Sequence, residues 1–231
     1  MPAARRRSLF VTGTDTGVGK TVVSTAIVRG LRVRGLDVGA MKPAETGVDE
    51  RGPLDAQALR EAAGDTDPLD LVCPYQFAMP AAPTVAAAAE GRAVELAPIR
   101  EAFDALVARH DLVVVEGAGG LLVPVTDEVD MAGLASVLGL PVLVVARAAL
   151  GTINHTLLTL AELDRRGLEC AGVVVSHSGG DLMAADAANL GDLRRRLGDR
   201  LLGEIPPLAP GSPADPRQID LDRIDGVLTR L

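Results

Sequence analysis

The sequence contains only two cysteines in 231 residues, and they lie far apart along the chain. Cys73 and Cys170 stand next to apolar residues and show neither the spacing of a metal site nor a disulfide framework. Isolated cysteines in such a context pack as small hydrophobic side chains. We therefore expect two buried thiols, and we exclude the disulfide-rich scaffolds of small secreted proteins.

The sequence also lacks a hydrophobic run that is long enough to cross a membrane. A long stretch without a charged residue, Met131 to Ala146, contains two glycines and a proline, whereas a membrane-spanning helix needs about 20 mostly apolar residues. Residues 1–7 include three arginines, but the apolar run after them is too short for a signal peptide. We expect a cytoplasmic protein whose N-terminus, residues 1–7, is unprocessed and flexible.

Positive charge is scarce, with 23 Lys and Arg against 31 Asp and Glu and a net charge of -8. Nucleic acids and anionic membranes bind proteins of the opposite sign, so we expect neither as a partner. Lysine is rarer still, because Lys20 and Lys42 are the only two in the chain. Where a bias toward arginine prevails, a retained lysine indicates a need for its compact ammonium group, chance retention being the alternative.

Short apolar runs alternate with segments of helical periodicity. Runs without polar alternation indicate strands buried on both faces, as in parallel sheets. The sequence therefore predicts an α/β fold, a single-domain, doubly wound, mainly parallel sheet of about seven strands over residues 1–231, with ligands at the carboxyl ends of the strands. The predicted strands are 8–12, 37–41, 111–115, 141–146, 171–175 and 201–205; the helices are 19–34, 54–63, 97–108, 153–166 and 183–197; the loops are 64–68 and 206–216.

The first predicted strand leads into a glycine-rich segment that precedes a helix. Five residues separate Gly13 from Gly-Lys-Thr, where the common phosphate-binding loop has four. Backbone N–H groups and a helix N-terminus bind phosphate, a lysine reaches the β- and γ-phosphates, and a threonine ligates Mg²⁺. The segment predicts nucleotide binding rather than an ordinary glycine-rich turn. The expected contacts are Asp15, Thr16, Gly17, Val18, Gly19, Lys20, Thr21 and Val22.

Three further candidate groups follow predicted strands or open a predicted helix. Lys42 follows the second strand, and Glu116 follows the third, where P-loop proteins carry a metal carboxylate. Two lysines facing one pocket would favour phosphoryl transfer to an anionic nucleophile, although Lys42 could also be a surface lysine. Asp55 begins a predicted helix, where a carboxylate is more often an N-cap than a metal ligand.

The segment Leu150 to His155 follows the predicted strand that ends near Ala146 and opens another predicted helix. Backbone N–H groups at such a helix start can bind an anion. His155 by itself is more often a capping or packed histidine than a catalyst.

Five segments, in the same order along most of the chain, resemble the dethiobiotin synthetase family. They are residues 13–21, 41–43, 116–120, Leu150-Gly151 with Asn154-His155, and 202–206. The resemblance implies an ATP-dependent cyclo-ligase that joins 7,8-diaminononanoate and CO₂ into the ureido ring of dethiobiotin, in biotin biosynthesis. It also implies Mg²⁺ and a homodimer. In this family an amine of the substrate captures CO₂ as a carbamate, which attacks the γ-phosphate, and the second amine closes the ring. No protein nucleophile is needed, in agreement with motifs made of lysines, glycines and carboxylates.

The resemblance also assigns roles to residues. Lys42 and Lys20 would be catalytic, the first at the carbamate and the second at the γ-phosphate. Mg²⁺ would be held by Thr21, Asp55 and Glu116. The nucleotide would further contact Gly117, Ala118, Gly119, Ser176, His177, Pro206, Pro207 and Leu208. The diamine substrate would contact Thr16, Lys42, Thr46, Leu150, Gly151, Thr152, Asn154 and, across a dimer interface, Asn189.

The chain departs from the pattern of the family that it resembles at two positions. Ser176-His177 stands where some members carry an asparagine that reads adenine, and Gly17 replaces a glutamate. A serine hydroxyl can rotate to suit either pattern of donors and acceptors, so we expect weak discrimination among ATP, CTP and GTP.

Two other functions share part of the pattern. A nucleotide-switched, partner-binding ATPase would carry a second lysine early in the phosphate loop, where Asp15 and Thr16 stand. The amidotransferases that make cobyrinate diamide share the loop but add a glutaminase domain with a nucleophilic cysteine, for which this sequence offers no candidate.

Overall fold

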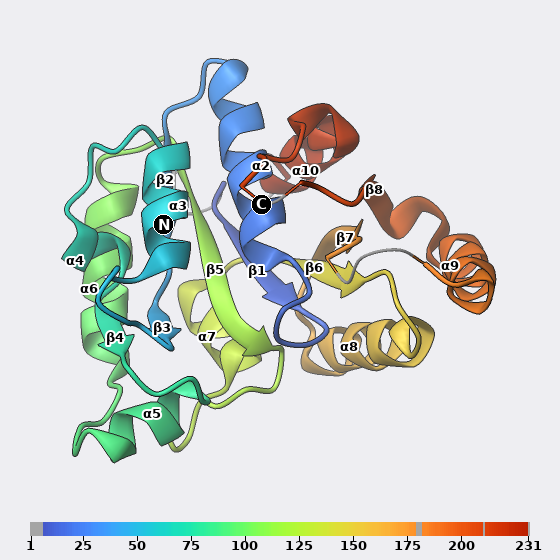
Figure 1. Ribbon diagram of the computed structural model, residues 1–231. Coiled ribbons are helices and arrows are strands. Elements are labelled where there is room, and N and C mark those ends of the chain that lie inside the picture. Colours follow the sequence, from blue (N-terminus) through green and yellow to red (C-terminus); the bar gives the residue numbers. More distant parts are fainter. Residues whose placement is uncertain (1–6, 179–181, 210, 231) are drawn as a thin grey trace.

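The computed structural model describes residues 7–178, 182–209 and 211–230 and shows a parallel β-sheet with helices on both faces (Figure 1). Six strands form the sheet in the order β2-β5-β1-β6-β7-β8, and each neighbouring pair is parallel. Later strands lie on both sides of β1, which confirms the doubly wound α/β fold. The strands are β1 (Leu9–Gly13), β2 (Val38–Met41), β5 (Leu112–Gly120), β6 (Val142–Arg147), β7 (Cys170–Ser176) and β8 (Leu201–Ile205).

Each of the six apolar runs in the sequence forms one strand of this sheet, so the sheet has six strands rather than about seven. Most strand ends agree with the prediction to within one residue. β5 is the exception, because it continues past residue 115 as Gly120 pairs with Gly13 beyond an irregularity in the ladder. Glu116 therefore lies inside a strand, where the sequence predicts a strand end.

Successive residues of the strands pack into two separate cores, one on each face of the sheet. Phe10 and Val113 belong to one core, which α6, α7, α8 and α9 cover. Leu9 and Val114 belong to the other, which α2, α3 and α10 cover. Burial on both faces explains why these strands are continuously apolar. The helices are α2 (Lys20–Val33), α3 (Leu54–Ala62), α4 (Leu69–Val72), α5 (Pro83–Ala89), α6 (Leu96–Val107), α7 (Met131–Leu138), α8 (Thr152–Arg166), α9 (Ala184–Leu197) and α10 (Leu221–Leu228), with 3₁₀ turns η1 (Gly198–Arg200) and η2 (Pro216–Gln218).

A second, two-stranded parallel sheet was not predicted from the sequence. It consists of β3 (Ala44–Thr46) and β4 (Tyr75–Phe77), and α5 packs against it. Three-residue strands leave no periodic signal, and their pairing joins segments about 30 residues apart. The sheet places the residues just after Lys42 in a strand that the sequence pattern does not predict.

The uncharged stretch from Met131 to Ala146 divides into α7 and β6. Asp130 starts α7 by accepting a hydrogen bond from the backbone N–H of Gly133. Within the described ranges, no helix is both long and apolar enough to span a membrane.

Several smaller expectations can be compared with the structure. Cys73 is a buried free thiol, as predicted, whereas Cys170 is only half-buried. Residues 1–6 and Pro210 lie outside the described part of the chain, and Arg7 pairs with Asp225. The described part of the predicted loop 206–216 contains neither helix nor strand up to Pro216, where η2 begins.

Candidate active site

The phosphate-loop segment, residues 13–21, joins the carboxyl end of β1 to the first turn of α2. The N-cap of α2 is Gly19, which has a φ of 93° and, as a glycine, no side chain that could cap the helix. The N–H groups of the first turn therefore remain available to an external acceptor such as phosphate. Gly13 allows a close approach, because a Cβ there would lie 2.7 Å from the carbonyl oxygen of Asp15. The extra residue in the spacing is thus accommodated by a tight turn.

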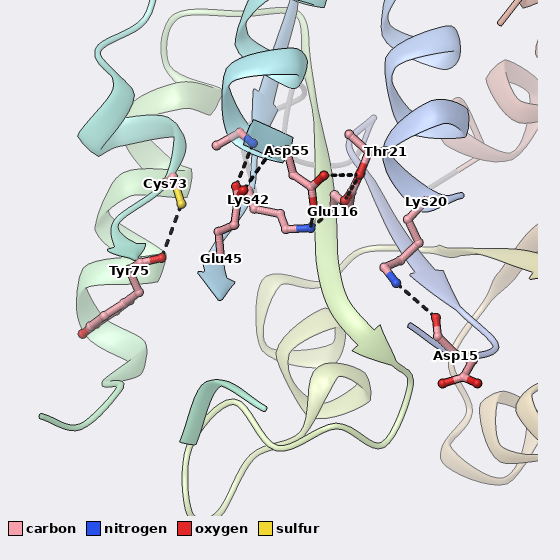
Figure 2. Close-up of polar contacts among 10 residues, drawn as sticks. Asp15, Lys20, Thr21, Lys42, Glu45, Asp55, Cys73, Tyr75 and Glu116 are labelled. Atoms are coloured by element: carbon pink, nitrogen blue, oxygen red, sulfur yellow. Dashed lines mark hydrogen bonds and ion pairs between the residues drawn. The ribbon is translucent and has the colours of Figure 1, made fainter. Parts of the chain in front are cut away.

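Four side chains, from α2, α3, β5 and the segment between β2 and β3, meet at the carboxyl end of the sheet (Figure 2). The Lys42 ammonium lies 2.6 Å from Glu116 Oε1 and 2.8 Å from Asp55 Oδ2. The Thr21 hydroxyl lies 2.8 Å from Asp55 Oδ1 and 2.9 Å from Glu116 Oε1. A hydroxyl has one proton, so Thr21 donates to one carboxylate at a time.

The charges of this cluster stabilise one another. Lys42 is 2% exposed and Glu116 is 0% exposed. Burial alone favours a neutral Lys42, but the Glu116 and Asp55 carboxylates outweigh it and raise the pKa of Lys42. Burial likewise opposes the charge of Asp55, yet Lys42 holds the pKa of Asp55 below its ordinary value. The burial of Lys42 excludes the alternative of a solvated surface lysine.

Lys20 lies in the same cleft in a less favourable electrostatic environment. Its ammonium donates a hydrogen bond of 3.2 Å to the backbone carbonyl of Asp15. Burial and, next, the charge of Lys42 lower the pKa of Lys20 to about 8. A bound anion beside Lys20 would therefore replace a stabilisation that the protein alone does not provide.

The oxygen atoms of Thr21, Asp55 and Glu116 can hold a divalent cation. In the part of the chain that the structure describes, no three His, Cys, Asp or Glu side chains form a metal cluster, so such a set depends on the Thr21 hydroxyl. Glu116 Oε2 is buried and has no hydrogen-bond partner among the described residues. Hard oxygen donors of this kind match the preference of Mg²⁺. Asp55 is the second residue of α3 rather than its N-cap.

Glu45 is a site residue that sequence reasoning missed. It lies in β3, is 7% exposed, and points toward the start of α3 (Figure 2). Its two carboxylate oxygens accept the backbone N–H groups of Asp55, at 2.9 Å, and Ala56, at 2.8 Å. Burial raises the pKa of Glu45. No local pattern signals this role, because the contact depends on the folding of β3 against α3.

Most of the predicted phosphate and metal residues line one cleft of about 320 Å³. Ala44, Glu45 and Ser178 also line it, although the sequence did not single them out. Ser178 bonds the Gly17 carbonyl through its hydroxyl, at 3.0 Å, and its position just after Ser176-His177 could have drawn attention to it. The predicted residues in the cleft are Thr16, Gly17, Gly19, Lys20, Thr21, Val22, Lys42, Thr46, Asp55, Ala118 and Gly119.

A second hollow, of about 440 Å³, adjoins the cleft through Val22 and Ser178. The predicted base-reading residues Ser176, His177 and 206–208 all line it. Ser176 is buried, and its side chain lies so close to the phosphate loop that a Cβ at Gly19 would collide with it. The His177 ring lies 2.5 Å from Glu204 Oε1, and this contact fixes its orientation.

The predicted carboxylate-binding segment lies in a different hollow. Leu150, Gly151, Asn154 and Asn189 line a space of about 460 Å³ together with Arg196. This hollow shares no lining residue with the cleft that contains the lysines. A fourth space, of about 450 Å³, touches the cleft at Thr16 and is lined mostly by apolar groups of residues 121–124 and α8.

Five further predicted site residues do not line the main cleft. Val18, Glu116, Gly117 and Thr152 are buried and line none of these hollows. Asp15 lines the apolar hollow with the exposed His155 of α8, beside Gly151.

Comparison with known proteins identifies the family. Residues 7–214 match the family model described as an AAA domain. The chain is 58% identical over 190 residues to the ATP-dependent dethiobiotin synthetase BioD of Anaeromyxobacter dehalogenans (strain 2CP-C), covering 80% of this chain and 85% of that protein. The chain belongs to the dethiobiotin synthetase family. Dethiobiotin synthetases of Aromatoleum aromaticum and Methanocaldococcus jannaschii are 42% and 40% identical, covering 90% and 73% of this chain and 94% and 78% of their own lengths. The resemblance predicted from the sequence is thereby confirmed.

Solved structures show the same fold in more distant proteins. The MinC:MinD cell division complex of Aquifex aeolicus matches with a TM-score of 0.54 at 15% identity, covering 96% of this chain and 94% of the matched chain. A ParA family ATPase from Chlorobium tepidum matches with a TM-score of 0.55 at 10% identity, covering 97% and 98%. At these identities the likeness concerns the fold alone, which this member of the dethiobiotin synthetase family shares with other P-loop proteins.

Proposed function

We propose that the chain is an ATP-dependent dethiobiotin synthetase, which joins 7,8-diaminononanoate and CO₂ into the ureido ring of dethiobiotin. The observation that carries the proposal is the placement of Lys20, Lys42 and Asp55 in one cleft, with the buried Glu116 paired to Lys42, in a chain that belongs to this family. The relatives are named for this ATP-dependent activity. The product lies on the route to biotin.

The reaction needs charge and position rather than a protein nucleophile. One amine of the substrate adds to CO₂ and releases a proton to give a carbamate. A carbamate oxygen attacks the γ-phosphorus, the bond to ADP breaks, and a carbamic-phosphoric anhydride forms. The second amine attacks the carbonyl carbon, loses a proton and expels phosphate as the ring closes. Both the carbamate and the triphosphate are anionic, so cationic groups that hold them together lower the barrier.

The two lysines have separate roles in this scheme. Lys42 keeps its charge because two carboxylates stabilise it, and it holds the carbamate against the transferring phosphoryl group. Lys20 starts α2 beside the phosphate-loop N–H groups, so it binds the γ-phosphate. Thr16 and Thr46 line the same cleft and contact the diamine.

Thr21, Asp55 and Glu116 hold the Mg²⁺ that accompanies ATP. Their oxygen atoms converge, and the orphaned Glu116 Oε2 gives one carboxylate oxygen free to bind a cation. Mg²⁺ bound there would neutralise charge on the β- and γ-phosphates.

The base of the nucleotide occupies the hollow beside Val22, between the end of β7 and the loop after β8. Its polar side chains are hydroxyls and one histidine that is already engaged with Glu204. The described residues that line it include no amide side chain, so weak discrimination of the base is expected.

The active enzyme is a homodimer in which α8 and the segment before it pack against the partner subunit. Leu122, Leu150, Leu157 and Leu158 are large apolar side chains exposed on one chain. Exposed apolar side chains in such numbers are typical of a protein interface. The carboxylate-binding hollow is separate from the cleft in one chain, so a second copy supplies it. The apolar hollow that touches the cleft at Thr16 takes the hydrocarbon chain of the substrate.

We place the enzyme in the cytoplasm, where ATP is available. Two free cysteines agree with a reducing compartment.

The release of phosphate from MgATP, with and without diaminononanoate and bicarbonate, tests this function. A ligase releases phosphate only when both co-substrates are present. A nucleotide-switched ATPase, whose fold is the same, would release phosphate at a rate that ignores both. Release without either co-substrate, at an undiminished rate, would overturn the proposal.

A further inference from the structure

The reaction scheme above makes no use of Glu45, although it is a buried carboxylate at the wall of the active-site cleft. We infer that Glu45 is a positioning residue for the metal site: its carboxylate holds the first turn of α3 and thereby sets the place of Asp55. This inference rests on the proposed Mg²⁺ site at Thr21, Asp55 and Glu116.

The first turn of α3 has no cap of its own. Its N-cap residue is Pro53, which makes no side-chain hydrogen bond. An N-cap side chain ordinarily accepts the N–H of the second or third helical residue, which here are Asp55 and Ala56. Glu45 accepts both N–H groups from a different element, at 2.9 and 2.8 Å. A negative charge at this end of a helix is also favoured by the helix dipole.

Asp55 needs this support more than Glu116 does. The Glu116 side chain is 0% exposed and lies on β5, so packing fixes it. The Asp55 side chain is 42% exposed, so packing alone does not set its direction. Its direction depends on its backbone, which Glu45 holds, and on its bonds to Thr21 and Lys42.

The chemistry of the contact requires a carboxylate. Two converging N–H donors need two acceptor atoms, and the two oxygens of Glu45 provide one each. A glutamine of the same shape has one oxygen and one NH₂ group, so one backbone donor would face another donor. Glu45→Gln therefore preserves volume and disturbs the start of α3. Groups that orient metal ligands in this way commonly contribute about 10-fold to 100-fold in metal affinity.

Binding of Mn²⁺ in the presence of ADP, measured by electron paramagnetic resonance, tests the inference without turnover. The variants are Glu45→Gln, Asp55→Asn and, as a matched control, Asp220→Ala. Asp220 caps α10 by accepting the N–H of Arg223 and lies outside the cleft, so its loss removes a helix cap without touching Asp55. We expect Glu45→Gln to weaken Mn²⁺ binding about 10-fold and Asp220→Ala to leave it unchanged.

Steady-state rates separate positioning from direct catalysis. In Glu45→Gln we expect the Mg²⁺ concentration for half-maximal rate to rise, while kcat at saturating Mg²⁺ falls less than about twofold, because the reacting groups are intact. Unchanged Mn²⁺ affinity, with melting temperature lowered as in Asp220→Ala, would show a structural role only and overturn the inference. A low kcat that saturating Mg²⁺ does not restore would overturn it too, by indicating contact with substrate. Unchanged Mn²⁺ affinity in Asp55→Asn would instead contradict the proposed metal site itself.

Discussion

At the scale of single residues, the two lysines show how the surroundings of an ammonium group change its pKa in opposite directions. Lys42 lies between two carboxylates and keeps its charge despite full burial. Lys20 has no carboxylate within bonding distance among the described residues, and its pKa falls to about 8. The sequence indicated both as functional from their rarity and position. It could not indicate that one would be paired inside the protein and the other left for a ligand.

Replacement of Lys42 tests its assigned role most directly. We expect Lys42→Ala to abolish dethiobiotin formation while the protein still binds ADP, because the phosphate loop is untouched. Removing one partner of a buried ion pair costs about 3–5 kcal/mol, so the variant should also melt at a lower temperature. Added Mg²⁺ should recover part of that loss by neutralising Asp55 and Glu116. Wild-type turnover in Lys42→Ala would remove Lys42 from the mechanism.

The buried thiol of Cys73 should resist alkylation in the folded protein. Burial raises the pKa of Cys73 to about 12, and only the thiolate reacts with alkylating reagents. The pKa is raised above the ordinary value of 9, so at pH 8 the thiolate of the folded protein is about 1000-fold rarer than in the unfolded chain. Iodoacetamide at pH 8 should therefore label Cys73 only after denaturation, as mass spectrometry of the peptides would show. Labelling of native protein at the unfolded rate would contradict the burial described here.

At the scale of elements, strands with a continuous apolar pattern were predictable from the sequence, whereas very short strands and contacts between distant segments were not. The six strands of the main sheet were predictable because burial on both faces makes them continuously apolar. β3 and β4 were not, since three residues carry no period and their pairing is non-local. Glu45 was missed for the same reason, because its partners belong to α3. Asp55 was predicted to be a metal ligand only through the family resemblance, because its position at a helix start by itself indicates a cap.

The end of β7 and the loop after β8 should discriminate bases weakly. The described lining of this hollow offers hydroxyls and a histidine held by Glu204, and a hydroxyl rotates to suit different base edges. We expect CTP and GTP to support turnover within about tenfold of ATP, a difference near 1.4 kcal/mol. Rates with each triphosphate at matched Mg²⁺ measure it. Strict dependence on ATP would indicate that backbone groups of residues 206–208 read the base.

At the scale of the whole molecule, the proposed reaction requires two copies of the chain. The described residues of one chain bring the residues proposed for phosphate and metal together, but they place the hollow proposed for the substrate carboxylate elsewhere. A substrate with a diamine at one end and a carboxylate at the other needs both sites at once. The exposed leucines of α8 and its neighbours mark the surface where the second copy would pack.

A charge on that surface should separate the copies. We expect Leu158→Arg to convert the protein from twice the chain mass to the single-chain mass, and to raise the KM for diaminononanoate, because Leu158 is 61% exposed on α8. Val33→Arg is the matched control, since Val33 is an exposed apolar residue of α2 on the opposite face of the sheet. Light scattering after gel filtration measures the mass. A fully active single-chain species would show that the hollow on α8 has another role.

The central claim is that the substrate, rather than water, attacks the γ-phosphate through a carbamate oxygen held by Lys42. Oxygen tracing tests it directly: bicarbonate enriched in ¹⁸O is mixed briefly with enzyme, diaminononanoate and MgATP in unlabelled water, and the released phosphate is analysed by mass spectrometry. The account predicts one ¹⁸O atom transferred to phosphate for each dethiobiotin formed, after correction for exchange of bicarbonate with water. Phosphate without ¹⁸O, formed together with dethiobiotin, would contradict it.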